Sequence, residues 1–306
     1  MPRKIIMVGA TGLIGKYLYR ELKQLGDEVI IFTRNPGEAA IILPGAKAYV
    51  EFNLSKPDKW RSIVDGSNAV IHLAGAAIGG VRWSEKNKKE IIKSRINTTR
   101  ALIDAIDKAN EKPAVFICAS AIGYYGTSDS SIFTEASPSG NDFLANVCKQ
   151  WEDEAAEVEK YGIRRVSIRT GFVLEKNEGA LAKMLLPYRL FIGGPLGKGG
   201  QWISWIHIAD VVNIYLHCLD DKNISGAVNA TAQNPVRMKE FAKTLGKVLK
   251  RPAIFRVPEF ILKIIFGESA DTILNGQKVL PVKMLNASFQ FKFVQLKEAL
   301  ENLFIK

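Results

Sequence analysis

Cysteine is scarce in this chain and follows no binding pattern. The three cysteines, Cys118, Cys148 and Cys218, are odd in number, far apart and without CxxC spacing. This argues against a disulfide framework and against a zinc site, because both need paired or clustered thiols. We therefore expect no metal, and we expect the thiols to be small buried hydrophobic groups in a reducing compartment.

The chain also lacks long apolar runs, a signal-peptide pattern, internal repeats and low-complexity segments. A membrane helix needs about 18 apolar residues, and no run approaches that length. With 47% hydrophobic and 24% charged residues, the composition is that of a globular protein. At 306 residues the chain is long enough for one large or two modest domains. We expect a cytoplasmic protein with no membrane partner.

Negative charge is in deficit, so that the formal net charge is +11. Much of the excess lies at the far end, where residues 236–306 hold thirteen Lys and Arg against six Asp and Glu, a surplus of seven. These cations alternate with Leu, Ile and Phe at helical spacing, and no nucleic-acid-binding motif accompanies them. The pattern indicates basic outer faces of amphipathic helices. We expect no nucleic-acid partner, but the charge would attract anionic, phosphorylated ligands.

The N-terminal segment carries the most informative motif that is present. The apolar run Ile5–Val8 leads into Gly9, Gly12 and Gly15 and then into a helical pattern that ends at Gly26. The first glycine permits a tight turn, the second lets the backbone approach a pyrophosphate, and the third lets the helix pack closely on the strand. This predicts a dinucleotide-binding turn, with the helix N-terminus supplying N–H groups. The predicted cofactor contacts here are Gly9, Thr11, Gly12, Leu13, Ile14 and Gly15.

The end of the second predicted strand bears on which dinucleotide binds. An NAD-type protein places an Asp or Glu about 20 residues beyond the glycine motif, where it bonds the ribose 2′-OH. Here that position holds Thr33 and Arg34, with no carboxylate. A hydroxyl followed by a guanidinium offers donors to a 2′-phosphate, so the sequence favours NADP(H) over NAD(H). The alternative is that Arg34 is a solvated loop arginine.

Short apolar segments alternate with helical stretches over the first 170 residues. The predicted strands are 5–8, 29–32, 48–52, 69–73, 115–118 and 166–168, and the predicted helices lie near 15–25, 85–109 and 143–161. The alternation predicts an α/β fold, a Rossmann-type doubly wound parallel sheet. The cofactor would lie across the carboxyl ends of its strands.

The pattern loosens after residue 170, which predicts a second lobe. Gly-rich turns occur at 193–200, and short strands mix with helices near 237–250, 258–266 and 294–303. We expect residues 1–170 to form the NADP-binding Rossmann domain, with segments around 200–232 returning to it. Residues 171–306 would form a smaller, interleaved α/β lobe for the substrate, including a C-terminal extension from about residue 250.

Several sequence blocks resemble a known superfamily. VIHLAGAA (70–77), SRINTTRALIDAI (94–106), CASAIGYYG (118–126) and WIHIADVV (205–212) resemble segments of the extended short-chain dehydrogenases/reductases, of the NAD-dependent epimerase/dehydratase type. The block PYRLFIGGPLGKGGQWISWIHI is similar to the atypical, epimerase-like branch, which adds a small C-terminal domain of unknown function. The likeness covers nearly the whole chain and implies NADP binding.

The resemblance also implies further cofactor contacts. Leu73, Ala74 and Gly75 would pass under the adenosine ribose, and main-chain groups of Thr170 and Gly171 would meet the nicotinamide. Arg95 would bond a cofactor phosphate and Glu90 a ribose hydroxyl, unless the basic stretch around them is only a solvated helix face. The remaining implied contacts are Ala119 and Ser120 at the fifth strand.

The usual catalytic groups of the superfamily are incomplete here. Working members use a Tyr-x-x-x-Lys pair, in which the lysine lowers the pKa of the tyrosine and the tyrosine acts as acid or base. Lys149 is the only lysine in place, Ala145 stands where the tyrosine is expected, and Ala121 stands at the usual hydroxyl position. Candidate substitutes are Ser120 and Tyr124, each able to donate to a substrate oxygen. Lys149 is otherwise a solvated helix lysine.

Two more side chains near the expected site have structural alternatives. Tyr125 belongs to a Tyr-Gly pair that turns the chain in this superfamily. His207 lies on the segment expected to return over the site, and the unperturbed pKa of histidine, ~6.5, is suited to proton transfer at neutral pH. A packed, hydrogen-bonded structural histidine is nevertheless the favoured interpretation.

The sequence holds the cofactor-binding motifs but lacks two of the usual catalytic groups, and two functions are consistent with this. The first is an NADP(H)-dependent oxidoreductase or epimerase-like enzyme of a small, sugar-like or anionic substrate. The second is a non-catalytic NADP-binding module for regulation or interaction, which presents its basic surface to a protein partner. Turnover of NADPH with aldehydes, ketones or nucleotide sugars distinguishes them, and a homodimer is compatible with either.

Overall fold

Apolar segments of four to seven residues form the centre of the fold. The computed structural model describes residues 2–79 and 83–305. Seven strands make one parallel sheet: β1 (Lys4–Val8), β2 (Glu28–Thr33), β3 (Ala48–Glu51), β4 (Ala69–His72), β5 (Val115–Ala121), β7 (Arg164–Thr170) and β11 (Gly226–Ala230). Their spatial order is β3-β2-β1-β4-β5-β7-β11. The predicted Rossmann-type doubly wound sheet is thus confirmed.

The order in which strands are added to the sheet changes side at β1. This change of side determines where a ligand can bind. The chain first adds β2 and β3 on one side of β1, then crosses over to add β4 and β5 on the other. In register, Val8 at the end of β1 lies beside Phe32 and His72. A crevice opens outside the carboxyl ends of parallel strands at such a switch point.

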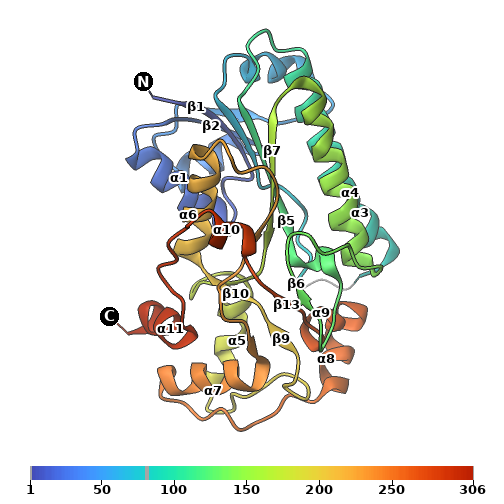
Figure 1. Ribbon diagram of the computed structural model, residues 1–306, viewed down its shortest axis with the longest axis vertical. Coiled ribbons are helices and arrows are strands. Elements are labelled where there is room, and N and C mark those ends of the chain that lie inside the picture. The colour runs from blue at the N-terminus through green and yellow to red at the C-terminus, as the bar shows by residue number, and fades with distance from the viewer. Residues whose placement is uncertain (1, 80–82, 306) are drawn as a thin grey trace.

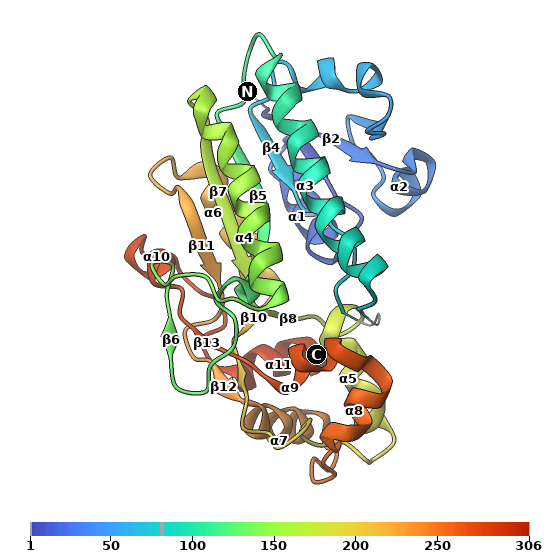
Figure 2. The same ribbon diagram turned by 90° about the vertical axis from the view of Figure 1, so that its right-hand side faces the viewer.

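Helices cover both faces of the sheet because successive side chains of each strand point to opposite faces. Ile5 and Met7 join the core beneath α1 (Leu13–Gln24) and α6 (Ile208–Asp220). Ile6 and Val8 join the core beneath α3 (Glu85–Asp107) and α4 (Phe143–Ala156), the face seen in Figure 2. The short α2 (Pro36–Ile42) packs at the β2–β3 edge.

A second body of structure lies below the sheet in Figure 1 and has a core of its own. Tyr188, Trp205, Phe241 and Leu300 are buried in that core. Three two-stranded pairs and short helices build it. The elements are β6 (Ile132–Phe133), β8 (Phe172–Leu174), α5 (Gly179–Arg189), β9 (Trp202–Ile203), β10 (Trp205–His207), β12 (Val236–Arg237), α7 (Met238–Leu249), α8 (Glu259–Phe266), α9 (Asp271–Leu274), β13 (Lys278–Val279) and α11 (Leu296–Phe304). The short α10 (Val282–Asn286) packs on β11 of the large sheet instead.

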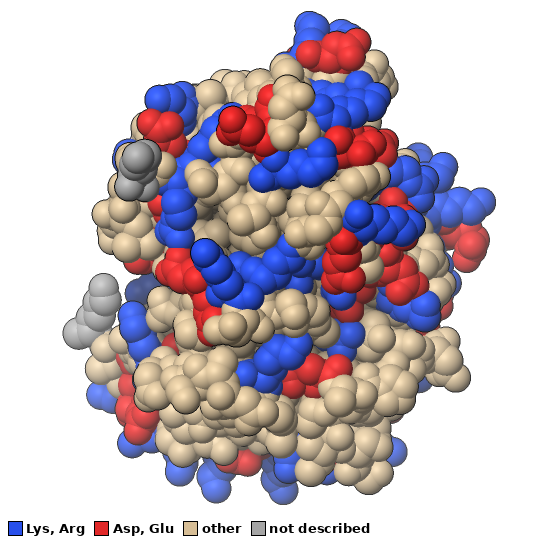
Figure 3. Space-filling view, turned by 45° about the horizontal axis from the view of Figure 1, so that its top comes forward, with Lys and Arg blue, Asp and Glu red and all other residues tan. Residues whose placement is uncertain are grey.

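The two bodies are interleaved along the chain. After β8 and α5 the chain returns to the large sheet through α6 and β11, where β11 pairs with β7. The predicted domain boundary at residue 170 stays a prediction. The chain does not pass from one body to the other at a single residue, because α6 and β11 follow residue 170 and lie on the large sheet. Among the described helices, none is long and apolar enough to cross a membrane. On the face drawn in Figure 3, Lys and Arg are interspersed with Asp and Glu over the upper part.

Candidate functional site

The turn between β1 and α1 is built so closely that it requires glycine. Gly9 has φ +82°, and a Cβ there would come within 2.7 Å of the Ala74 nitrogen in the loop after β4. A Cβ on Gly15 would lie 2.6 Å from the carbonyl oxygens of Gly9 and Ala10. The turn, the helix and the neighbouring β4 loop therefore pack backbone against backbone, which side chains would prevent.

The N-terminus of α1 is available to an anion. Gly12 is its exposed N-cap, and no side chain caps the first turn. Thr11, Leu13 and Ile14 are only partly buried. The first N–H groups of α1 and the positive end of its dipole are thus directed at the carboxyl ends of the strands, where the switch point lies. This arrangement fits a pyrophosphate.

The end of β2 presents donors and no acid. Thr33 is half-buried at the last position of the strand, Arg34 is exposed, and Asn35 caps α2 by accepting the N–H of Glu38. The Asn35 N–H in turn donates to Thr33 Oγ1 over 3.3 Å. No ion pair to Arg34 occurs in the described part of the chain, so its guanidinium is available to a ligand phosphate.

Arg95 supports the β4 loop from beneath. Leu73 and Ala74 are half-buried and Gly75 is exposed, while the Arg95 side chain is buried. The guanidinium donates to the carbonyls of Ala76 (3.1 Å) and Ile91 (2.9 Å). A Cβ on Gly75 would come within 2.9 Å of Arg95 Cζ. The guanidinium therefore already has protein partners that hold the loop in place.

The predicted roles of Arg95 and Glu90 toward a cofactor stay predictions. Glu90 is exposed on α3 and Arg95 lies more than one turn further along the same helix. Burial lowers the pKa of Arg95. Arg82, which begins the basic stretch before α3, lies outside the described residues.

The end of β5 turns the Ser120 hydroxyl into the protein. Ser120 is 5% exposed and donates to Glu152 Oε1 on α4 over 2.6 Å. Ala119 and Ala121, its neighbours on the strand, are both partly exposed. Neighbouring side chains of a strand point to opposite faces of the sheet. Ser120 faces α4, so Ala121 points to the opposite face. The roles of Ser120 toward substrate and cofactor stay predictions; in this structure its hydroxyl donates to Glu152.

Arg169 is the centre of a buried polar network. Its Nε and Nη2 bond the two carboxylate oxygens of Glu152, both over 2.8 Å, and its Nη1 donates to the Tyr125 hydroxyl over 2.9 Å. That hydroxyl donates to Asn229 Oδ1 on β11 over 2.6 Å. Burial opposes the charge of Arg169, but the bonds to Glu152 outweigh it and the net pKa of the guanidinium is raised. The network ties together β5, α4, β7 and β11.

Tyr124 lies at the surface of this network. It belongs to the 3-10 turn Ile122–Tyr125 that follows β5, and it is partly exposed. Its ring centroid lies 3.4 Å from Arg169 Cζ, a stacked cation–π contact, and its ring meets that of Tyr125 edge-on. No hydrogen bond to the Tyr124 hydroxyl occurs among the described residues. The Tyr125 hydroxyl is buried and already bonded to Arg169 and Asn229, and burial raises the pKa of Tyr125 to about 12.

Lys149 faces solvent from α4. Its Nζ pairs with Asp153 over 2.7 Å, and both side chains are more than half exposed. The Asp153 bond, and to a smaller extent the electrostatic effect of Tyr124, raises the pKa of Lys149. Ala145, one turn before it, is completely buried. The lysine of the usual pair is thus present, and the position of its tyrosine is filled by packing.

Gly171 closes the site at the end of β7. Its N–H donates to the Ala230 carbonyl, and a Cβ would lie 2.3 Å from the Ser204 carbonyl oxygen. Thr170, the last residue of β7, is half-buried beside it. Packing alone thus accounts for the glycine, and contact of these two residues with a nicotinamide stays a prediction. No group of His, Cys, Asp and Glu in residues 2–79 and 83–305 is arranged to hold a metal.

Sequence reasoning missed the partners of Arg169. Its partners Glu152 and Tyr125 lie 17 and 44 positions from it on other elements, so no local spacing joins them. One signal was available, because β7 lies inside the sheet between β5 and β11, where a buried arginine needs a carboxylate partner. The CKQWE block, which supplies Glu152 on the apolar side of α4, is the nearest candidate.

Comparison with known proteins places the chain in one family. The sequence profile of the NAD dependent epimerase/dehydratase family matches residues 5–230, and that of a domain of unknown function, DUF1731, matches residues 257–303. The Epimerase family protein SDR39U1 homolog, chloroplastic, of Arabidopsis thaliana is 44% identical over 97% of this chain and 85% of its own length. The Epimerase family protein YfhF of Bacillus subtilis is 41% identical over 98% and 97%.

Solved structures of other proteins superpose on this chain over nearly its whole length. A human epimerase family protein SDR39U1, crystallised with NADPH, is 33% identical, covers 98% of both chains and superposes with a TM-score of 0.87. A UDP-glucose 4-epimerase of Thermotoga maritima, at 16% identity and a TM-score of 0.80, shares the fold. The resemblance to the epimerase-like branch with its C-terminal domain of unknown function is confirmed. The chain belongs to the NAD dependent epimerase/dehydratase family.

Proposed function

We propose that this protein binds NADP(H) and acts as an oxidoreductase or epimerase-like enzyme on a small, sugar-like or anionic substrate. The observation that carries the cofactor is the glycine turn at the switch point together with the acid-free end of β2, where Thr33 and Arg34 stand. The human relative crystallised with NADPH supports the choice of dinucleotide.

The residues present fit each part of the dinucleotide. The bare N-terminus of α1 suits the pyrophosphate, and the exposed Arg34 guanidinium suits a 2′-phosphate. Leu73 and Ala74 precede the Ala76 carbonyl that Arg95 holds, and their backbone would lie beneath the adenosine side. Thr170 and Gly171 stand at the far end of the same edge, where a nicotinamide would lie.

The chemistry we propose assigns one proton to Tyr124. NADP(H), when bound, supplies hydride exchange at its nicotinamide. Tyr124 donates its hydroxyl proton to a substrate oxygen, because its hydroxyl is unpaired among the described residues and its ring is held against Arg169. Glu152, which also accepts the Ser120 hydroxyl, holds that arginine with two hydrogen bonds. Lys149 is the remaining cation near Tyr124 and would exchange Asp153 for the ribose or the substrate.

The cofactor assignment is tested by titrating the protein with NADPH and following the nicotinamide fluorescence. We expect Arg34→Ala to weaken NADPH binding by about 10-fold or more, because a charge-assisted bond to the 2′-phosphate is lost, and to leave NADH binding unchanged. Arg189→Ala, an equal loss of charge at an exposed helix end, is the matched control. Equal losses in the two variants would contradict the assignment.

The proton assignment is tested by turnover. NADPH absorbance is followed with a panel of aldehydes, ketones and nucleotide sugars, first for the wild type and then for Tyr124→Phe. We expect about 100-fold or more lower kcat at unchanged NADPH affinity, which is the usual contribution of a positioned acid. Tyr161→Phe, at a surface tyrosine outside the site, is the control. A Tyr124→Phe protein with full kcat would remove Tyr124 from the mechanism.

A second candidate function is a non-catalytic NADP-binding module. The observation that favours it is the loss of two of the usual three groups to Ala121 and the buried Ala145. Such a module reports the redox state only if the oxidised and reduced cofactors bind its conformations with different affinities. Tight NADPH binding without turnover on the whole panel, with NADPH and NADP⁺ affinities that differ, would favour the module over the enzyme.

A further inference from the structure

The second body carries a cluster of large apolar side chains that its core does not cover. Two stretches of chain supply them, residues 186–192 at the end of α5 and residues 254–261 at the start of α8. An exposed group of large apolar side chains marks a surface that meets a partner or a membrane. We call this cluster the apolar tip. Its members, each more than a third exposed, are Leu186, Leu190, Phe191, Ile192, Ile254, Phe255, Phe260 and Ile261.

The two stretches of the apolar tip lie side by side. The Phe255 N–H donates to the Gly193 carbonyl and the Val257 N–H donates to the Pro195 carbonyl, both over 3.1 Å. A Cβ on Gly194 would lie 2.0 Å from the Phe255 carbonyl oxygen. Backbone contacts thus hold the tip as one surface. Figures 1 and 2 place α7 and α8 at the end of the molecule away from the N-terminus.

Phe191 is displayed at the tip by an unusual backbone conformation. Its φ is +61°, in the left-handed region that a bulky side chain rarely adopts. The ring is 54% exposed and stacks on Arg251, with 4.4 Å between the ring centroid and Cζ. The strained backbone thus presents an aromatic ring to solvent instead of burying it, which favours a functional surface over a packing role.

The helix α8 is more exposed than its sequence would normally allow. Six of its eight residues, EFILKIIF, are apolar, but only Leu262 is buried. A helix that is apolar around most of its circumference normally lies in a core. Phe260 in its first turn is 63% exposed, and Ile254 in the segment before it is 78% exposed. These two side chains therefore project from the surface.

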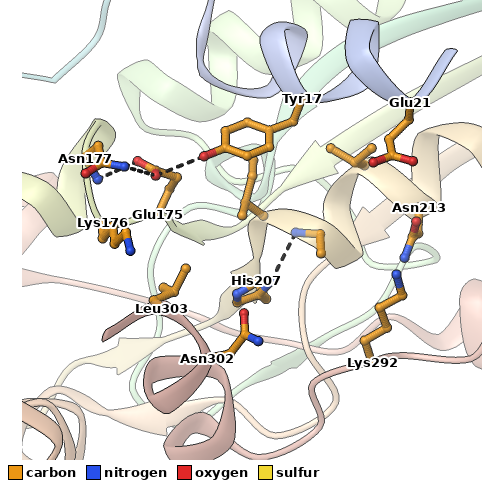
Figure 4. A pocket seen from close by; sticks show the side chains of 13 residues that line it. Tyr17, Glu21, Glu175, Lys176, Asn177, His207, Asn213, Lys292, Asn302 and Leu303 are labelled. Carbon is orange, nitrogen blue, oxygen red and sulfur yellow. Dashed lines mark hydrogen bonds between the residues drawn. The ribbon is translucent and has the colours of Figure 1, made fainter. Parts of the chain in front are cut away.

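Cations gather beside the tip, with no acid among them. A hollow of about 640 Å³ between α7 and residues 251–256 is lined by Ile254 of the tip and by seven cations. The cavity between α1, α6 and α11 (Figure 4) differs, because Glu21 and Glu175 line it together with Lys176 and Lys292. The cations of the hollow, all exposed, are Lys198, Lys239, Lys243, Lys247, Lys250, Arg251 and Arg256. We call this surface the basic hollow.

We propose that the apolar tip and the basic hollow bind the surface of a membrane that contains anionic lipids. The apolar side chains enter the boundary between headgroups and acyl chains, and the lysines and arginines meet the lipid phosphates. A second copy of the chain fits less well, because a two-fold contact through the hollow would bring its seven cations against the same seven.

Binding to a membrane surface needs no helix that spans the bilayer. The expectation of no membrane partner rested on the lack of a long apolar run, whereas the tip is assembled from short stretches that meet only in the folded chain. The proposal departs from that expectation for this reason. It is independent of the cofactor assignment, because no proposed cofactor contact belongs to the tip or lines the hollow.

Co-sedimentation of the full chain with lipid vesicles tests the proposal. The vesicles contain phosphatidylcholine alone or phosphatidylcholine mixed with phosphatidylglycerol, and each kind is assayed at low and at high salt. We expect binding to the anionic vesicles that weakens at high salt, and binding to phosphatidylcholine alone that is about 10-fold weaker or more. No binding to either vesicle, or equal binding to both, would overturn the proposal.

A charge variant tests the basic hollow. Lys243→Glu with Lys247→Glu, one turn apart on α7, should weaken binding to the anionic vesicles by about 10-fold or more. Lys56→Glu with Lys59→Glu makes the same change of net charge at exposed residues of the sheet body and is the matched control. Equal losses in the two variants would mean that net charge alone acts, which would overturn the assignment to this surface.

An apolar variant tests the tip. Phe191→Asn with Ile254→Ser should weaken vesicle binding by about 10-fold or more. Because Asn tolerates the left-handed conformation, thermal stability and NADPH binding should be unchanged. Ile41→Ser, at a side chain 83% exposed on α2, is the matched control. If the double variant does not fold, Ile254→Ser alone takes its place. Full vesicle binding by the tip variant would overturn the proposal.

Two other occupants of the tip have their own signatures. Sedimentation velocity detects a second copy, as a dimer that the tip variant dissociates. A fluorescent amphipathic peptide of Glu and Leu detects an acidic protein partner. Either result without vesicle binding would assign the tip to that occupant and overturn the membrane proposal.

Discussion

At the residue scale, one buried ion pair decides how the site is held. Arg169 and Glu152 are 4% and 9% exposed, and the pair also fixes Ser120 and Tyr125. Removing one partner would leave the other as an uncompensated buried charge. The pair therefore links stability to the position of Tyr124, whose ring lies on the guanidinium.

We expect Arg169→Met to lower the free energy of unfolding by about 3–5 kcal/mol, because the Glu152 carboxylate is left buried and unpaired. Urea unfolding measures this. The double variant Arg169→Met, Glu152→Leu should recover most of the loss, since no charge remains. Lys297→Met, which breaks an exposed pair with Glu301, is the control and should be close to wild type. A double variant less stable than the single one would contradict the account.

The two buried histidines predict how stability depends on pH. Burial lowers the pKa of His72 to about 3 and that of His207 to about 4. In the unfolded chain both bind a proton near pH ~6.5, so below that pH the unfolded state holds more protons and the folded state loses stability. At about pH 5 the loss is roughly 2 kcal/mol per histidine.

Urea unfolding at about pH 7.5, 6 and 5 measures this dependence. The free energy of unfolding should fall steadily below pH ~6.5, and His207→Gln should show a flatter decline than the wild type. A free energy that is constant or rises from pH ~7.5 to ~5 would mean that neither histidine is held neutral.

Single residues were predictable where a local motif or a backbone constraint defines them. Gly9 and Gly15 follow from the motif, and the structure shows the contacts that forbid a Cβ. The hydrogen-bond acceptor of the Ser120 hydroxyl could not be predicted from the sequence, because Glu152 lies 32 positions away on another element. Such pairings depend on tertiary packing, which one sequence does not display.

At the element scale, the strands of the sheet interior were predicted to within a few residues. β1, β2, β4 and β5 are apolar runs bounded by turn residues, and burial on both faces makes them readable. β11, Gly226–Ala230, was not singled out because GAVNA is short and holds a glycine and an asparagine. It is a strand because β7 offers it a partner.

The turn between β1 and α1 yields a prediction at this scale. Gly15→Ala should destabilise the protein by about 1–3 kcal/mol, because the Cβ would overlap two carbonyl oxygens at 2.6 Å. It should also weaken NADPH binding by displacing the turn. In α2, a Cβ on Gly37 would meet only Asn35 Oδ1, at an ordinary contact distance of 3.8 Å, so Gly37→Ala should be neutral or slightly stabilising. Thermal unfolding of both variants measures this, and equal effects would contradict the packing argument.

At the scale of the whole molecule, the cofactor half and the catalytic half differ in how they are encoded. The cofactor half comes from contiguous segments, residues 9–15, 33–34 and 73–75, each at the carboxyl end of a strand. The proposed catalytic half joins Tyr124 and Lys149 with Arg169, which holds the Tyr124 ring, from three elements. For that reason the sequence could name the cofactor and the fold but only propose candidates for the chemistry.

The central claim is that the chain binds NADP(H) through its N-terminal turn and Arg34. Isothermal titration of the wild-type protein with NADPH and with NADH tests it most directly. We expect NADPH to bind at least about 10-fold tighter than NADH, the value of one charge-assisted phosphate contact. Equal affinities would contradict the role of Arg34, and no binding of either dinucleotide would contradict the proposed function itself.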